Sequence, residues 1–125
     1  MIRALFVIAA GLGVFGLAQL PPHAGSGPEA KLELQNEAVH VLRIRIAPRE
    51  HIPMHEVTPR VVVWLTDAQL RDTLADGTTR DMRAKAGQVE WVPAQRHAGE
   101  NLGDRPVEFL AIIPKGTSSR AAHNR

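Results

Sequence analysis

Hydrophobic and polar residues alternate along much of the chain, which is the pattern of half-buried β-strands. The segment 39–46 shows it most clearly, because Leu42 and Ile44 fall on one face and Arg43 and Arg45 on the other. Residues 60–66 are instead β-branched and apolar at successive positions. This second pattern predicts a strand that is covered on both faces.

The segment 67–75 has two interpretations. Asp67 could cap a short helix that ends at Gly77, or Asp76-Gly77 could form a two-residue hairpin turn between strands 69–75 and 78–84. We favour the hairpin, because eight residues make a marginal helix and strands are expected on either side.

Further strands are expected over 88–92, 96–102 and 106–113. Seven or eight short strands at a spacing of about eight to twelve residues are typical of an all-β sandwich or barrel.

The first twenty residues lack this alternation. One basic residue, Arg3, precedes an uncharged run over 4–20, and Pro21 and Pro22 follow. This order is typical of a secretory signal, although the run is nearly long enough for a membrane span. We therefore expect an exported protein, periplasmic or secreted. The alternative is an uncleaved anchor formed by residues 4–20, which would bring the protein to the membrane.

The remaining boundaries follow from composition. Residues 21–35 contain Pro, Gly and Ser and predict a linker, while the polar segment 116–125 predicts a flexible tail. One domain over 36–115 remains. A β-domain of this size buries a limited share of its surface, so we expect a homodimer.

Composition narrows the function. Fifteen Lys and Arg are interspersed with thirteen Asp and Glu, and the chain has no Tyr, so we expect no nucleic-acid partner. The absence of cysteine excludes disulfides, thiolate metal ligands and a cysteine nucleophile. The sequence also has no Gly-x-Ser-x-Gly motif of hydrolases, no P-loop and no dinucleotide-binding glycine motif.

Two segments, 48–55 and 87–101, each combine a short β-like run with a proline and a histidine. In each, the proline is expected to end the run and the histidine, His55 or His97, to lie just beyond it. We hypothesise that two strand ends deliver both imidazoles to one cavity.

The second segment resembles a motif of the small single-domain cupins, whose fold is a double-stranded β-helix, or jelly roll. Gln95 stands where this motif usually has a second glycine. The residues that fit the motif are Gly87, Pro93, His97 and Asn101. The resemblance covers roughly residues 36–115 and implies a cupin-like jelly-roll barrel.

The first cupin motif is less complete. His55 occupies its first histidine position, but Arg49 replaces the glycine and Val57 replaces the second histidine. The position of the motif's glutamate falls on Val61 or Val62. Two of the four metal ligands of the family are therefore apolar in this chain.

The resemblance implies His55 and His97 as ligands of one divalent metal, since cupin enzymes bind Fe, Mn, Ni or Zn through three histidines and one glutamate. Two protein ligands are fewer than such metal sites generally have, so a metal would need further ligands, here called recruits. Candidate recruits are His40, His51, Glu56 and Glu90. The alternative is a pocket that the two histidines line without metal, and no cofactor is certain.

Four further residues are expected to bind a ligand in the barrel: Trp64, Trp91, Arg60 and Asn101. Tryptophans on strands more often belong to the core, and Arg60, which could meet a ligand carboxylate, is more typical of a solvated rim. We expect an exported cupin-like domain that binds a small molecule and has a reduced metal site. The alternative is a metal-dependent enzyme of the dioxygenase or isomerase type, and whether the protein is an enzyme stays open.

Overall fold

The computed structural model describes residues 27–116. The predicted signal or anchor over 1–20 lies outside this range, as does the predicted tail apart from Gly116. Between residues 27 and 116 there is no helix that could cross a membrane.

Nine strands and no helix form in the described part of the chain. The strands are β1 (Glu29–Gln35), β2 (Val39–Ile46), β3 (His51–Val57), β4 (Arg60–Trp64), β5 (Ala68–Leu74), β6 (Thr79–Ala84), β7 (Val89–Val92), β8 (Gln95–Asn101) and β9 (Val107–Pro114).

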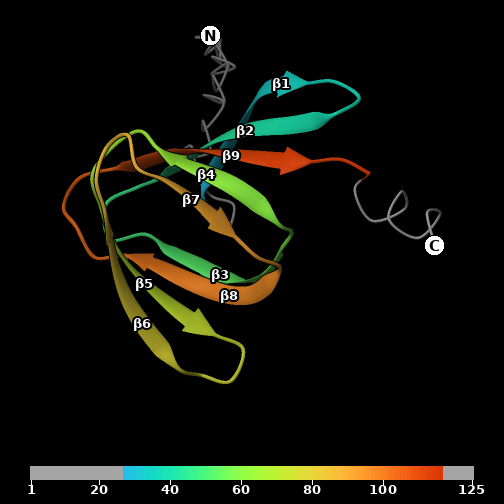
Figure 1. The fold of residues 1–125 in the computed structure, drawn as a ribbon. Coiled ribbons are helices and arrows are strands. Elements are labelled where there is room, and N and C mark those ends of the chain that lie inside the picture. The colour runs from blue at the N-terminus through green and yellow to red at the C-terminus, as the bar shows by residue number, and fades with distance from the viewer. Residues whose placement is uncertain (1–26, 117–125) are drawn as a thin grey trace, which may run out of the picture.

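The strands form two antiparallel sheets that face each other (Figure 1). One sheet has the order β1-β2-β9-β4-β7 and the other has the order β3-β8-β5-β6. From β2 to β9 every connection passes from one sheet to the other, as in a jelly roll, except that the β5–β6 hairpin stays within the smaller sheet. The prediction of an all-β jelly roll is therefore confirmed.

The alternation of the sequence explains most of the strands. β2 has the predicted bounds, and the favoured hairpin forms from β5 and β6, so the helical alternative is wrong. The hairpin loop contains three residues rather than two, because Leu74 N donates to Thr78 O (2.8 Å) and Gly77 N donates to Leu74 O (2.9 Å). Gly77 has a φ of 86°, a conformation that glycine adopts without steric cost.

Two strand predictions need correction. β1 falls inside the predicted linker 21–35. Ala30, Leu32 and Leu34 alternate with polar residues there, a strand pattern that the linker prediction overlooked, although all seven residues are exposed. It pairs with β2 and extends the larger sheet. The strand expected to be covered on both faces, β4, is buried only toward the other sheet, at Val62 and Trp64.

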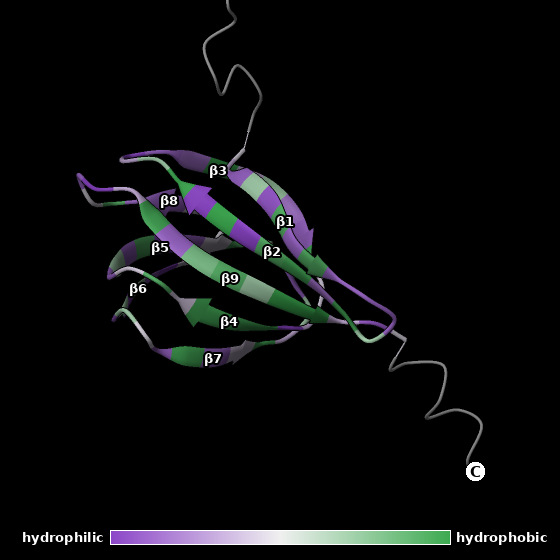
Figure 2. Ribbon diagram, turned by 90° about the horizontal axis from the view of Figure 1, so that it is seen from above, coloured by the Kyte–Doolittle hydropathy of each residue, from purple (hydrophilic) through white to green (hydrophobic). Residues whose placement is uncertain are grey.

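The core lies between the two sheets. Hydrophobic and hydrophilic residues alternate along strands such as β2 (Figure 2). The buried members of the core are Ile46, Val62, Trp64, Ala68, Leu70, Ala84 and Val107. Phe109 packs against this cluster, with its ring centroid 5.0 Å from that of Trp64.

Two similar turns precede β3 and β7. In the first, Glu50 N donates to Ala47 O (3.1 Å), and the third residue, Arg49, has a φ of 61°. In the second, Gln88 N donates to Lys85 O (2.9 Å), and Gly87 has a φ of 89°. A positive φ at the third position is typical of a type II turn and favours glycine. Arg49, which replaces the first motif's glycine, therefore keeps a conformation that strains a side chain.

Asn101 connects the end of β8 to two loops. Its Nδ2 donates to Ala47 O (3.1 Å) and to Arg105 O (2.8 Å), and its Oδ1 accepts from Gly103 N (3.0 Å). The side chain is fully buried, so these bonds satisfy polar groups that water cannot reach. Asn101 is thus a structural residue rather than the ligand-binding residue that we expected.

We predict that Arg49→Gly stabilises the protein by about 0.5–1 kcal/mol, because relief of the left-handed strain exceeds the added entropy of the unfolded chain. Arg49→Ala is the matched control, since it removes the same side chain but keeps a Cβ. Urea denaturation measures both. Equal stability changes for the Gly and Ala variants would contradict the prediction.

Candidate functional site

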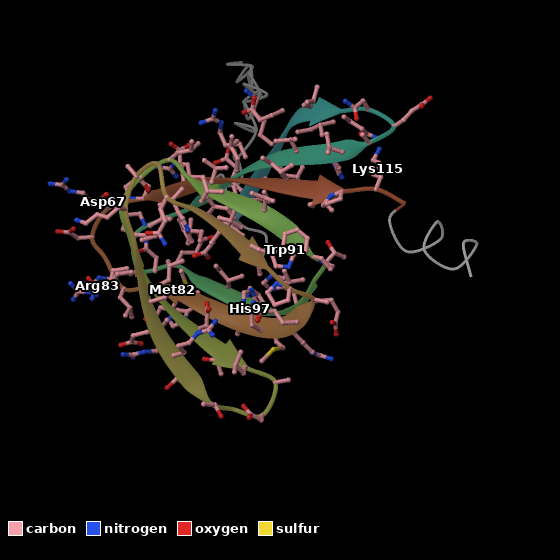
Figure 3. The ribbon with its side chains drawn as sticks, in the orientation of Figure 1. Asp67, Met82, Arg83, Trp91, His97 and Lys115 are labelled. Carbon is pink, nitrogen blue, oxygen red and sulfur yellow. The ribbon has the colours of Figure 1, made fainter. Side chains whose placement is uncertain are left out.

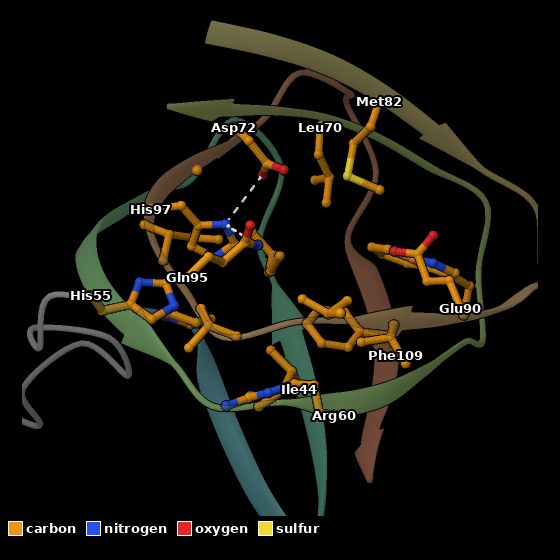
Figure 4. A pocket seen from close by; sticks show the side chains of 18 of the residues that line it. Ile44, His55, Arg60, Leu70, Asp72, Met82, Glu90, Gln95, His97 and Phe109 are labelled. Atoms are coloured by element: carbon orange, nitrogen blue, oxygen red, sulfur yellow. Dashed lines mark hydrogen bonds and ion pairs between the residues drawn. The ribbon is translucent and has the colours of Figure 1, made fainter. Parts of the chain in front are cut away.

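A cavity of about 460 Å³ opens between the sheets beside the core (Figure 4). Core residues such as Val62, Trp64 and Leu70 form part of its wall. Met82 and His97 also line it, whereas Arg83 lies on the other side of the β6 strand, away from the cavity (Figure 3). The charged and imidazole side chains that line the cavity are His55, Arg60, Asp72, Arg80, Glu90, His97 and Glu100.

The cavity brings together the two histidines of the motifs. His55 on β3 lies directly opposite His97 on β8, and their ring centroids are 4.9 Å apart. Both histidines lie within their strands and not just beyond the ends, because Pro53 is part of β3 and Pro93 precedes β8. Cross-strand pairing, rather than two strand ends, thus places the imidazoles side by side.

The hydrogen bonds of the two rings indicate different tautomers. Nδ1 of His55 lies 2.8 Å from Pro53 O, and since a carbonyl oxygen only accepts, this nitrogen carries the hydrogen. Nδ1 of His97 lies 3.3 Å from Nε2 of Gln95, which is a donor, so Nδ1 of His97 accepts. When both rings are neutral, the pair offers a lone pair at Nε2 of His55 and an N–H at Nε2 of His97.

Asp72 and Arg80 are site residues that the sequence reasoning missed. Asp72 is buried on the inward face of β5, and Nη2 of Arg80 lies 3.3 Å from its Oδ2. Oδ1 of Asp72 lies 3.9 Å from Nδ1 of His97, which is too long for a hydrogen bond. The available signal was a carboxylate in line with Ala68 and Leu70 on the apolar face of the predicted hairpin strand.

Burial is the main reason why the pKa of His97 lies below its usual value. The Asp72 carboxylate raises this pKa, while the charges of His55, Arg60 and Arg80 lower it further. His97 is therefore neutral near pH 7, and its contact with Asp72 is not an ion pair at that pH.

We predict that the pKa of His97 lies below 6.5 and moves in opposite directions in two variants. Asp72→Asn should lower it, because a negative charge is lost, and Arg80→Gln should raise it, because a positive charge is lost. NMR titration of the His97 Cε1 proton, assigned with His97→Gln, measures these values. A wild-type pKa above 6.5, or a rise in Asp72→Asn, would contradict this account.

The metal implied by the cupin resemblance can be tested against the donors at the family's ligand positions. His55, Val57, Val62 and His97 all line the cavity, whereas Val61 does not. Two of the four positions therefore present alkyl groups, which supply no lone pair. Within residues 27–116, no group of three His, Asp or Glu side chains is placed to hold a metal ion. The donor set does not fit a divalent metal.

The recruits proposed from the sequence do not complete a metal site. His51 and Glu56 are exposed, and they contact Glu100 (3.7 Å) and Arg96 (3.7 Å), respectively. His40 lies on β2 and does not line the cavity. Glu90 does line it, but in Figure 4 it lies beyond Phe109, away from the two histidines.

The residues expected to bind a ligand separate into three groups. Arg60 and Trp64 line the cavity, and Trp64 is 3% exposed, so it belongs to both the core and the cavity wall. Trp91 contributes to the wall but is 56% exposed and pairs with Val61, which points away from the cavity. Asn101 does not line the cavity.

Comparison with solved structures identifies the fold. A cupin domain from Bordetella pertussis Tohama I is 24% identical, with a TM-score of 0.67 over 72% of this chain and 95% of that one. A protein with a double-stranded β-helix domain from Klebsiella pneumoniae is 18% identical, with a TM-score of 0.59 over 77% of this chain and 84% of that one. A polyketide cyclase from Streptomyces resistomycificus is 16% identical, with a TM-score of 0.56 over 74% of this chain and 71% of that one.

No protein-family model matches the sequence, and no curated protein matches it. The structural similarities establish that the chain has the double-stranded β-helix fold of the small cupins. The resemblance predicted from the motifs around His55 and His97 is thereby confirmed at the level of the fold.

Proposed function

We propose that this domain binds a small organic molecule in the cavity between its sheets and needs no divalent metal to do so. The observation that carries the proposal is the cavity itself. Its volume of about 460 Å³ lies within the range of typical ligand pockets, roughly 300–1,000 Å³.

The lining of the cavity favours an organic ligand with one polar end. Ile44, Ile46 and Phe109 present apolar surface, while the imidazoles of His55 and His97 offer one acceptor and one donor. Ligand pockets typically combine a mostly apolar wall with a few convergent polar groups.

The polyketide cyclase shares this fold, so the fold accepts organic molecules in at least one other protein. At 16% identity this similarity does not transfer a substrate, because one fold hosts many functions.

Export and homodimerisation remain proposals that rest on the sequence. Exposed apolar side chains at the two edge strands of the larger sheet support a dimer; they are Leu32 and Leu34 on β1 and Val89 and Trp91 on β7.

The neutral compound 1-naphthylacetamide tests whether the cavity admits an organic molecule. Met82 lines the cavity and Met54 does not, so their methyl groups act as a reporter and an internal control. We predict that the compound shifts the ¹³C-methyl NMR signal of Met82 and leaves that of Met54 in place.

Val92→Trp should reduce the affinity of the compound at least about tenfold, because an indole ring in place of the small valine side chain at this lining position fills part of the cavity. Val89→Trp makes the same exchange on the same strand, at an exposed position outside the cavity, and should leave the affinity unchanged. An unshifted Met82 signal at millimolar compound, or equal affinities of the two variants, would contradict the proposed function.

A further inference from the structure

Arg60 is the one arginine among the cavity-lining residues whose hydrogen bonds all go to uncharged groups. It is the first residue of β4 and is partly buried. Its Nε donates to Thr58 O (2.8 Å), and its Nη2 donates to Thr58 Oγ1 (3.0 Å). Two of the five N–H groups of the guanidinium are thus used, and both hold it in place.

Burial lowers the pKa of Arg60, and no carboxylate contributes to the shift. The other arginine of the cavity is Arg80, whose charge is offset by Asp72, with Nη2 of Arg80 3.3 Å from Oδ2 of Asp72. A guanidinium keeps its charge at any physiological pH, so Arg60 is a cation removed in part from water without an anion to offset the cost. A bound anion would recover this free energy.

The free N–H groups favour a carboxylate. With Nε and one hydrogen of Nη2 engaged by Thr58, the end of the guanidinium formed by Nη1 and Nη2 stays available. Two parallel N–H groups match the two oxygens of a carboxylate. A dianion such as a phosphate monoester suits the cavity less well, because Asp72 and Glu90 also line it.

We propose that the cavity binds an organic monocarboxylate whose carboxylate pairs with Arg60 and whose apolar part packs against the wall formed by Ile44, Val62 and Phe109. This inference rests on the proposed function and adds the chemical class of the ligand. Arg60 is the residue that selects this class.

His97 provides an independent reporter of the pairing. The carboxylate of Asp72 faces His97 from β5, and the imidazole of His55 faces it from β3. The guanidinium groups of Arg60 on β4 and Arg80 on β6 also act on its charge. Glu90 and Glu100 also line the cavity. The charge of Arg60 lowers the pKa of His97, so a carboxylate bound to Arg60 should raise that pKa, whereas a neutral ligand of the same shape should not.

The test compares 1-naphthylacetate with 1-naphthylacetamide, which have nearly the same shape and differ in charge. Binding is followed by the Met82 methyl signal and by the titration of His97. We expect the acetate to bind wild-type protein at least about tenfold more tightly than the amide, since a charged hydrogen-bonded pair replaces a neutral contact. We also expect only the acetate to raise the pKa of His97.

Arg60→Gln should reduce the preference for the acetate to within about twofold and should leave binding of the amide in place, which shows that the cavity is intact. Arg83→Gln removes the same charge from an exposed position outside the cavity and should keep the full preference.

The outcomes separate the two proposals. If both compounds bind wild-type protein with equal affinity, the carboxylate inference is wrong and the proposed function stands. If the acetate is preferred equally in wild-type protein and in Arg60→Gln, Arg60 is not the partner and the inference is also wrong. If neither compound shifts Met82, the proposed function itself is contradicted.

Discussion

The candidate site depends on the pairing of β8 with β3 on one side and with β5 on the other. Pairing with β3 sets His97 opposite His55, and pairing with β5 brings Asp72 near His97. Because side chains alternate along a strand, a shift by one residue would turn these groups out of the cavity. Asn101 helps to hold this register, since its buried amide connects the end of β8 to the backbone of Ala47 and Arg105.

The electrostatics of the cavity follow from partial burial. Burial keeps His97 neutral and removes part of the hydration of Arg60, whose hydrogen bonds go to Thr58 and not to a carboxylate. The charges of Arg80 and Asp72 offset one another. A cavity that is mostly apolar strengthens each of these effects, because charges interact more strongly away from water. The same burial that makes His97 a weak base therefore makes Arg60 a candidate anchor for an anion.

Much of the fold could be predicted from the sequence, because alternation and turn residues are local signals. The bounds of β2 and the β5–β6 hairpin followed from them directly. β1 carries the same alternation at Ala30, Leu32 and Leu34, but it was missed because the Pro, Gly and Ser residues of 21–28 led us to extend the linker over it. Its side chains are exposed, and its pairing with β2 attaches it to the larger sheet.

The site was less predictable, because its geometry depends on contacts between distant strands. The pairing of His55 with His97 could be inferred from a familiar motif, but the position of Asp72 depended on the register of β5 with β8. We expected Asn101 and Trp91 to bind the ligand because the sequence does not show where their side chains point. The Asn101 side chain is buried among backbone groups, and that of Trp91 is largely exposed.

The proposed organic ligand would occupy the place where the cupin resemblance implies a metal. Val57 and Val62 line the cavity where the cupin resemblance places two metal ligands, and the two remaining imidazoles are too few for a divalent ion. Calorimetric titration of the untagged protein with Zn²⁺ and Mn²⁺, beside the His55→Ala, His97→Ala double variant, measures whether the two histidines hold a divalent ion. We expect metal affinities that agree within about twofold between the two proteins, and a higher affinity for Val57→His, which restores a third donor. One equivalent of tightly bound metal in the wild-type protein, lost in the double variant, would contradict this expectation.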